Sequence, residues 1–283
     1  IEEFSAPFLS PIDKKLSEKT ILFGDLHVHT TYSLDAFIGN LPILEGEGTH
    51  PAADACNYAR FCANLDFFSI NDHAEFLTRR EWTDTIQSLR DCSRISNESD
   101  ESSIVPFLGW EWTQTSLDIE KHYGHKNVIL KSLQENIPER PIGAPDHKFF
   151  KSIVDAPAYT LFGAMLYDYK NVSYYLNYRQ RQLLIKSLEY CDNSTHVKDL
   201  PLDCLERAER PSDLYRKLDE WGADSLVIPH GSAWGNTSPP MATWKNQLNI
   251  ADHNPRYQKL IEVFSGHGNT EEYRSWEAFK ILD

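Results

Sequence analysis

The sequence predicts an α/β fold in which helices connect the strands of a parallel sheet. Short runs rich in apolar and β-branched residues recur along the 283-residue chain, and longer stretches that suit helices separate them. The composition, with 41% hydrophobic and 25% charged residues, is typical of a folded globular protein. Length alone does not separate one large barrel from two ordinary domains.

Six runs are predicted to be strands. They are Thr20 to Leu26, Asp66 to Asn71, Ile104 to Trp110, His125 to Leu130, Ser225 to Pro229 and Leu260 to Phe264. Between them, helices are predicted at Ala52 to Asn64, which follows Pro51, and at Trp82 to Ser93. Another helix is predicted at Ser212 to Glu220, with Ser212 as its N-cap.

Residues 137–211 are predicted to form a mostly helical insertion within a single domain that spans residues 1–283. Several prolines make the stretch from Ile137 to Pro157 irregular, and the Tyr- and Leu-rich segment Tyr159 to Tyr190 suits one or two helices. We expect this insertion to shape the mouth of any site.

The balance of charge restricts the possible partners. The formal net charge is -14, from 42 acidic and 28 basic side chains, which disfavours a nucleic-acid partner. Bound metal ions could still reverse the field inside one pocket and admit an anionic substrate. No run of about eighteen apolar residues is present, so no membrane span is predicted.

The five cysteines lack the CxxC spacing of structural zinc sites and redox motifs. In an exported protein, Cys56 could pair with Cys62 and Cys191 with Cys204, whereas five scattered thiols would be ordinary in the cytosol. An odd count leaves at least one thiol free or paired with sequence beyond this chain.

Side chains that can bind metal ions lie where predicted strands end, the place where parallel sheets and barrels put their ligands. In strand order, the candidates are His27 with His29, Asp72 with His73, Glu111, His125, His230 and His267. All of them follow the end of a strand except His125, which begins the fourth.

The spacing of His27 and His29 suits a strand, because residues two apart face the same side and both imidazoles can reach one ion. Chance or packing would explain two isolated histidines at this spacing equally well. The His, Asp and Glu residues at further strand ends disfavour that explanation for the whole set. Imidazole and carboxylate without thiolate suit Zn²⁺, Mn²⁺ or Fe²⁺, and Glu111 could bridge two ions. Two or three such ions would lower the pKa of a water molecule and bind phosphoryl oxygens.

Other candidates are weaker. Glu262, inside the sixth predicted strand, is expected to orient a ligand, and His122 to lie in a loop or just outside the ligand set. Trp110 and Trp112 are expected to be core and wall residues. Solvated positions are expected for four loop histidines, His50, His147, His196 and His253.

The segment from Gly24 to Thr30, with Ser33, Asp35 and the motif at residues 71–73, resembles the polymerase-and-histidinol-phosphatase (PHP) superfamily. Blocks at residues 107–113, 122–129, 228–231 and 262–268 resemble its domain-of-unknown-function branch DUF3604. The resemblance covers most of residues 20–283. It implies a distorted seven-stranded (β/α) barrel with a di- or trinuclear site that hydrolyses phosphoesters with a metal-activated hydroxide.

The resemblance also implies how the ligands are shared. They would fall into three pairs around a bridging Glu111, namely His27 with His29, His125 with His230, and Asp35 with His73. Asp35 stands where many relatives have histidine. Glu111 and His230 are the candidate catalytic residues.

The superfamily completes its site with an Asp-x-His motif on the last strand, and none follows the last predicted strand here. Asp252 and His253 are adjacent and lie in a predicted loop. Together with the count of six strands, this predicts a fragment of a longer protein, with a barrel that is incomplete at its C-terminus. Relatives of the branch look exported, which implies a periplasmic or secreted protein, with the cytoplasm as the alternative.

The function predicted is therefore metal-dependent hydrolysis of a small-molecule phosphoester or a related anionic substrate. One alternative is hydrolysis of another ester or amide bond on a similar barrel, but amidohydrolases usually add a strand-borne lysine, and the predicted strands end without one. The other alternative is a metal-binding module without catalysis.

Overall fold

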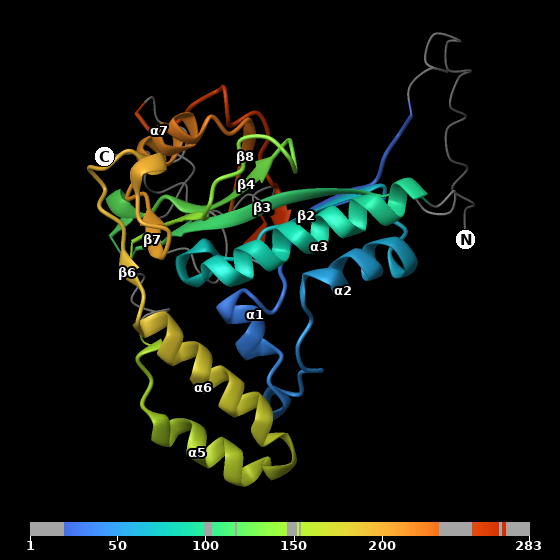
Figure 1. Cartoon of the computed structure of the whole chain (residues 1–283), viewed down its shortest axis with the longest axis vertical. Coiled ribbons are helices and arrows are strands. Elements are labelled where there is room, and N and C mark those ends of the chain that lie inside the picture. The colour runs from blue at the N-terminus through green and yellow to red at the C-terminus, as the bar shows by residue number, and fades with distance from the viewer. Residues whose placement is uncertain are drawn as a thin grey trace, which may run out of the picture.

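The structure is a computed structural model. It describes residues 20–98, 104–116, 118–145, 152, 154–231, 251–265 and 268–269. A curled sheet forms half of a barrel wall, and helices pack against it (Figure 1), which confirms the α/β class. These residues supply five strands of the main sheet, so a seven-stranded barrel stays a prediction.

The main sheet has the order β1-β2-β3-β4-β8. Its strands are β1 (Gly24–Val28), β2 (Phe67–Ile70), β3 (Val105–Gln114), β4 (Gly124–Leu130) and β8 (Ser225–His230). β1, β2 and β3 are parallel, whereas β4 is antiparallel to both β3 and β8, so the all-parallel expectation is wrong for β4. The reason is the connection: residues 115–123 are too few for a parallel crossover, which needs about a dozen or more.

The strand predicted at Leu260 to Phe264 is also wrong. Residues 260–263 form no strand, and the two-residue strands β9 (Phe264–Ser265) and β10 (Gly268–Asn269) pair with each other. The chain does run beside β8, where the backbone N–H of Glu262 donates to the carbonyl oxygen of Pro229 at 3.1 Å. Because Pro229 has no N–H to donate, a regular ladder cannot continue there.

Helices α2 (Ala52–Asn57) and α3 (Arg79–Glu98) lie together against the sheet (Figure 1), and α2 continues as a π-helical turn at Tyr58–Cys62. Both helices were predicted, α3 with shorter bounds. Helix α7 (Pro211–Trp221) starts with Pro211 and has Arg210 as its N-cap, so the predicted cap at Ser212 is wrong. Proline suits the first helical position because its missing N–H would have no partner there.

The predicted insertion contains α5 (Ala158–Tyr167) and α6 (Val172–Lys186), a hairpin that projects from the sheet (Figure 1). It also contributes a second sheet of very short strands, β5 (Ile142–Gly143), β6 (Glu189–Tyr190) and β7 (Cys204–Arg207), in the order β5-β7-β6. Strands of two to four residues are too short for periodicity to predict.

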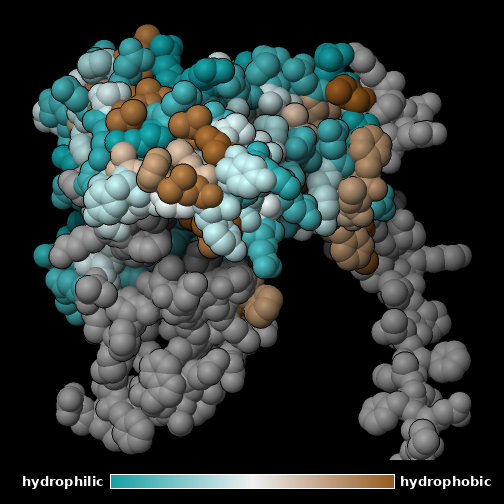
Figure 2. Space-filling model, turned by 90° about the horizontal axis from the view of Figure 1, so that it is seen from below, coloured by the Kyte–Doolittle hydropathy of each residue, from teal (hydrophilic) through white to brown (hydrophobic). Residues whose placement is uncertain are grey.

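The end of the molecule formed by α5 and α6 shows apolar side chains on its surface (Figure 2). The side chains of Tyr159 and Phe162 in α5 are exposed.

Arg181 of α6 joins the hairpin to the loop that follows β1. Its guanidinium donates to the carbonyl oxygens of Thr31, at 2.8 Å, and Tyr32, and its Nε lies 3.1 Å from Oε1 of Glu81 in α3. Helix α1 (Leu34–Gly39) packs on α6 through a small apolar cluster of its own. The insertion therefore supports the segment that carries Ser33 and Asp35.

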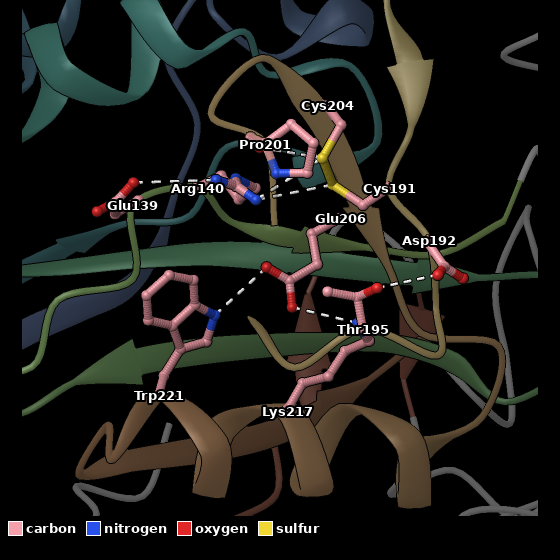
Figure 3. Close-up of a disulfide and its surroundings, with 10 residues drawn as sticks. All are labelled: Glu139, Arg140, Cys191, Asp192, Thr195, Pro201, Cys204, Glu206, Lys217 and Trp221. Carbon is pink, nitrogen blue, oxygen red and sulfur yellow. Dashed lines mark hydrogen bonds and ion pairs between the residues drawn. A yellow bond between two sulfur atoms is a disulfide. The ribbon is translucent and has the colours of Figure 1, made fainter. Parts of the chain in front are cut away.

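Two disulfides are present, Cys56–Cys92 between α2 and α3, and Cys191–Cys204 around the loop between β6 and β7 (Figure 3). The second pairing was predicted. The pairing of Cys56 with Cys62 is wrong, and Cys62 is an exposed free thiol. Six residues of helix separate those two Cα atoms by about 9 Å, beyond the reach of a disulfide. No helix in the described ranges is long and apolar enough to cross a membrane.

Candidate metal centre

Five histidines and three carboxylates converge at one edge of the main sheet. β1, β2, β3 and β8 all end there, and because β4 is antiparallel it begins there. His125 at the start of β4 therefore pairs with Thr113 near the end of β3 and with His230 at the end of β8. His73 follows β2 and forms an isolated bridge with Glu111. The reversed strand explains why a histidine at a strand start joins histidines at strand ends.

Glu111 lies at the centre of this convergence and is fully buried. Its Oε2 atom is 3.0 Å from Nε2 of His29 and 3.5 Å from Nε2 of His27, and the two nitrogens are 3.1 Å apart. In a tetrahedral site with bonds of about 2.0 Å, ligand atoms lie about 3.3 Å from each other. The three donor atoms therefore have the separations that one ion requires.

The other carboxylate oxygen of Glu111, Oε1, faces a different set of imidazoles. Nδ1 of His125 is in close contact with it, and Nε2 of His230 lies 3.4 Å away. A third group consists of Asp35 and His73, whose Oδ2 and Nε2 atoms are 3.2 Å apart, together with His29. The structure thus brings together all three ligand pairs that the resemblance implied, with Glu111 between them.

Burial and charge set the protonation of the cluster without metal. Burial alone would raise the pKa of Glu111, but His73, His230 and His125 outweigh it and hold that pKa well below its usual range. Burial opposes charge on His27, yet hydrogen bonds to Glu111 and Glu262 raise its pKa to about 9. The pKa of His73 is likewise raised, to about 10, because the charges of Glu111 and Asp35 outweigh the opposing effect of burial. Without metal, protons on His27 and His73 therefore balance the negative charge of Glu111, a role that divalent ions could take over.

Two polar side chains contact His27 and His29 at Nδ1, the ring nitrogen that does not face Glu111. Oε2 of Glu262 lies 2.9 Å from Nδ1 of His27, which agrees with the expectation that this carboxylate orients a ligand. Glu262 also forms a possible ion-binding group with His27 and His230. The hydroxyl of Ser33 lies 2.7 Å from Nδ1 of His29 and accepts the backbone N–H of His73 at 2.8 Å.

Asp72 was predicted to be a ligand, but the structure does not bring it into any of these groups. Its buried carboxylate accepts the backbone N–H and the hydroxyl of Thr30 at 2.6 and 2.7 Å, and burial raises its pKa. It therefore holds the loop that follows β1. The candidate ligand His267 lies outside the described residues, as does His147.

Several other polar and aromatic residues lie outside the possible ion-binding groups. His122 is buried just before β4, where its Nδ1 accepts the backbone N–H of Ser116, and it joins no ligand group among the described residues. Trp110 and Trp112 are core residues, as predicted, and their indole N–H groups donate to backbone carbonyls. The same ligand groups also lack the loop histidines His50, His196 and His253.

Two residues beside the cluster were missed. Thr113 is buried two residues after Glu111, on the same face of β3, and that spacing could have revealed it. Glu75 is buried in the turn after His73, where Oε1 accepts the N–H groups of Thr113 and Ala144. Burial raises the pKa of Glu75 to about 7. No sequence signal marks Glu75, because a glutamate in a turn is normally solvated.

Residues 16–98 match the model of a family described as a protein of unknown function, DUF3604. This confirms the DUF3604 part of the resemblance over that segment, which carries His27, His29, Asp35 and His73. No curated protein and no solved structure matches the chain. The described residues thus hold buried histidine and glutamate groups that could bind a metal ion, and their imidazole and carboxylate donors suit Zn²⁺, Mn²⁺ or Fe²⁺.

Proposed function

We propose that the chain is a metal-dependent hydrolase of the PHP superfamily that cleaves phosphoesters. The observation that carries this proposal is the position of Glu111, whose two carboxylate oxygens face two different sets of imidazoles. A carboxylate shared in this way is what two neighbouring ions need as a bridge. Divalent ions bound there would activate water as a nucleophile and neutralise the charge on phosphoryl oxygens.

The exposure of the side chains indicates where a substrate would approach. Glu111, His73, His125 and His230 are at most 3% exposed, whereas Asp35 is 45% exposed. His27 and His29 are intermediate. The open side of the cluster therefore lies beside Asp35, His29 and His27, and we place the anionic group of the substrate there.

The position of Lys126 supports a phosphoesterase over an amidohydrolase. It is a lysine within the main sheet, one residue after His125, so it faces the opposite side of β4. Its buried amino group donates to the carbonyl oxygen of Tyr123 at 2.6 Å and lies over the ring of Trp112, and burial lowers its pKa to about 7. It does not supply the cluster with the lysine that amidohydrolases usually add.

The experiment is a hydrolysis assay with aryl phosphate monoesters and diesters after loading with Mn²⁺ or Zn²⁺. We expect turnover that depends on metal and disappears in Glu111→Gln. The control is Glu206→Gln, which changes a buried glutamate outside the cluster. Full metal occupancy without turnover of any phosphoester would refute phosphoester hydrolysis, and turnover of carboxylic esters or amides instead would favour the other hydrolase.

We also propose that the protein is exported, because disulfides persist mainly in oxidising compartments. The support is the pair of disulfides, one of which joins two core helices. Cell fractionation of the native host would test this, and recovery of fully reduced protein from the cytosol would contradict it.

A further inference from the structure

The hydroxyl of Thr113 contacts both His73 and the central carboxylate of Glu111. Its Oγ1 atom lies 2.7 Å from Nδ1 of His73 and 3.0 Å from Oε1 of Glu111. Thr113 is 1% exposed, and its backbone N–H donates to Glu75, so its position is held from both sides. It approaches His73 at Nδ1, the ring nitrogen opposite the one that faces Asp35, so it is not a ligand of the ion proposed for that pair, and it also lies 3.5 Å from Nδ1 of His125.

The single hydroxyl proton can be assigned. If it pointed to His73, two oxygen lone pairs would face each other at 3.0 Å between Thr113 and the ionised carboxylate of Glu111. Donation to Glu111 removes that repulsion and makes a charge-assisted hydrogen bond. The hydroxyl must then accept a hydrogen bond from Nδ1–H of His73, since that nitrogen lies within hydrogen-bond distance.

We propose that Thr113 is a positioning residue that fixes the tautomer of His73. With its proton held on Nδ1, His73 presents Nε2 as the metal-binding atom, and this is the atom that faces Asp35 at 3.2 Å. The same hydroxyl orients Glu111, so one side chain couples the His29–Asp35–His73 group to the bridging carboxylate. This inference rests on the proposed metal centre.

Ser33 provides the contrast. Its hydroxyl accepts the backbone N–H of His73 and lies beside Nδ1 of His29, but no carboxylate of the described residues is hydrogen-bonded to it to fix the direction of its proton. Geometry therefore assigns a tautomer to His73 and not to His29.

The test compares Thr113→Val with Thr113→Ser by zinc titration against a chromophoric chelator. Valine keeps the shape and removes the hydroxyl, and we expect it to weaken the binding of one ion by about 10- to 100-fold. Serine keeps the hydroxyl and is expected to rescue affinity. Retention of wild-type affinity and stoichiometry by Thr113→Val would overturn the inference while leaving the metal centre intact.

A second measurement remains decisive if Thr113→Val does not fold. In the zinc-loaded wild-type protein, long-range ¹H–¹⁵N correlation spectra should show His73 protonated on Nδ1 and bound to metal through Nε2. Metal on Nδ1 would contradict the role of Thr113. A wild-type protein that binds no zinc at all would refute the metal centre and this inference with it.

Discussion

Two buried glutamates of this protein behave in opposite ways. Glu206 of β7 pairs with Lys217 of α7 at 3.3 Å and accepts the indole N–H of Trp221 (Figure 3). Burial raises its pKa, although Lys217 opposes the shift. Glu111 is equally buried, yet its pKa lies well below the usual range because several imidazoles face it. Glu206 belongs to a closed structural pair, whereas Glu111 belongs to a set of donor atoms spaced for ions.

The largest effect on metal binding is expected when the same substitution, glutamate to glutamine, is made at Glu111 and at Glu206 in turn. Glu111→Gln should weaken zinc or manganese binding by more than about 100-fold, because a shared ligand is lost and second-sphere changes alone reach that size. Glu206→Gln removes the charge partner of Lys217 but should leave the metal content of the folded fraction unchanged. Metal analysis after dialysis measures both, and equal metal content in the two variants would remove the distinction between the glutamates.

The second prediction concerns stability at the closed pair. Lys217→Met leaves Glu206 buried without its charge partner and should lower the free energy of unfolding by about 3–5 kcal/mol. Metal stoichiometry of the folded fraction should not change. Urea denaturation of the metal-free protein measures the loss. The double variant Glu206→Leu with Lys217→Met should recover much of it, and a single variant as stable as the wild type would contradict the pairing.

The third prediction uses the pKa of the cluster histidines. Raised folded-state pKa values stabilise the metal-free protein fully below the unfolded value of 6.5, and this stability is lost as pH rises through about 9 for His27. Metal affinity should rise over the same window, because imidazolium protons must leave before ions bind. Thermal unfolding with chelator or with Mn²⁺, between pH 6 and pH 9, measures both trends. His27→Gln should flatten the metal-free trend, and a metal-free protein that gains stability toward pH 9 would contradict it.

The smallest effect is expected at the disulfide beside the closed pair. The guanidinium of Arg140 lies 3.7 Å from both sulfur atoms of Cys191–Cys204 (Figure 3), and a cation there stabilises thiolate. We expect a dithiol reductant to open this disulfide before Cys56–Cys92, which serves as the internal control. Thiol trapping followed by mass spectrometry measures the order. Arg140→Gln should shift the midpoint several-fold toward more reductant, and no shift would argue against the role of Arg140.

The convergence of side chains near strand ends was the most predictable feature of the site. Six predicted ligands, His27, His29, His73, Glu111, His125 and His230, do converge, because the ends of strands in one sheet share an edge. The resemblance added Asp35, which a helix start brings beside His73. Asp72 could not be separated from the ligands by sequence, because the direction of its side chain depends on Thr30, more than forty residues away.

The fold was less predictable than the site. The direction of β4 depends on the length of one connection, and the failed sixth strand depends on a proline in its neighbour. The partner of Cys56 lies on a different helix, so no local spacing identifies Cys92. Thr113 reaches His73 from another strand, and Glu75, two residues after His73, is held there by the backbone N–H groups of Thr113 and Ala144. Local patterns predict where candidate ligands lie along the chain, whereas the residues that would orient them depend on packing.

The most direct test of the metal centre is anomalous diffraction from crystals soaked in Mn²⁺ or Zn²⁺. We expect at least two anomalous peaks, one beside each carboxylate oxygen of Glu111, at about 2.0–2.2 Å from the ligand atoms. One peak should lie with His27 and His29, and the other with His125 and His230. Crystals that show bound ions elsewhere but none within bonding distance of Glu111 would refute the proposed metal centre.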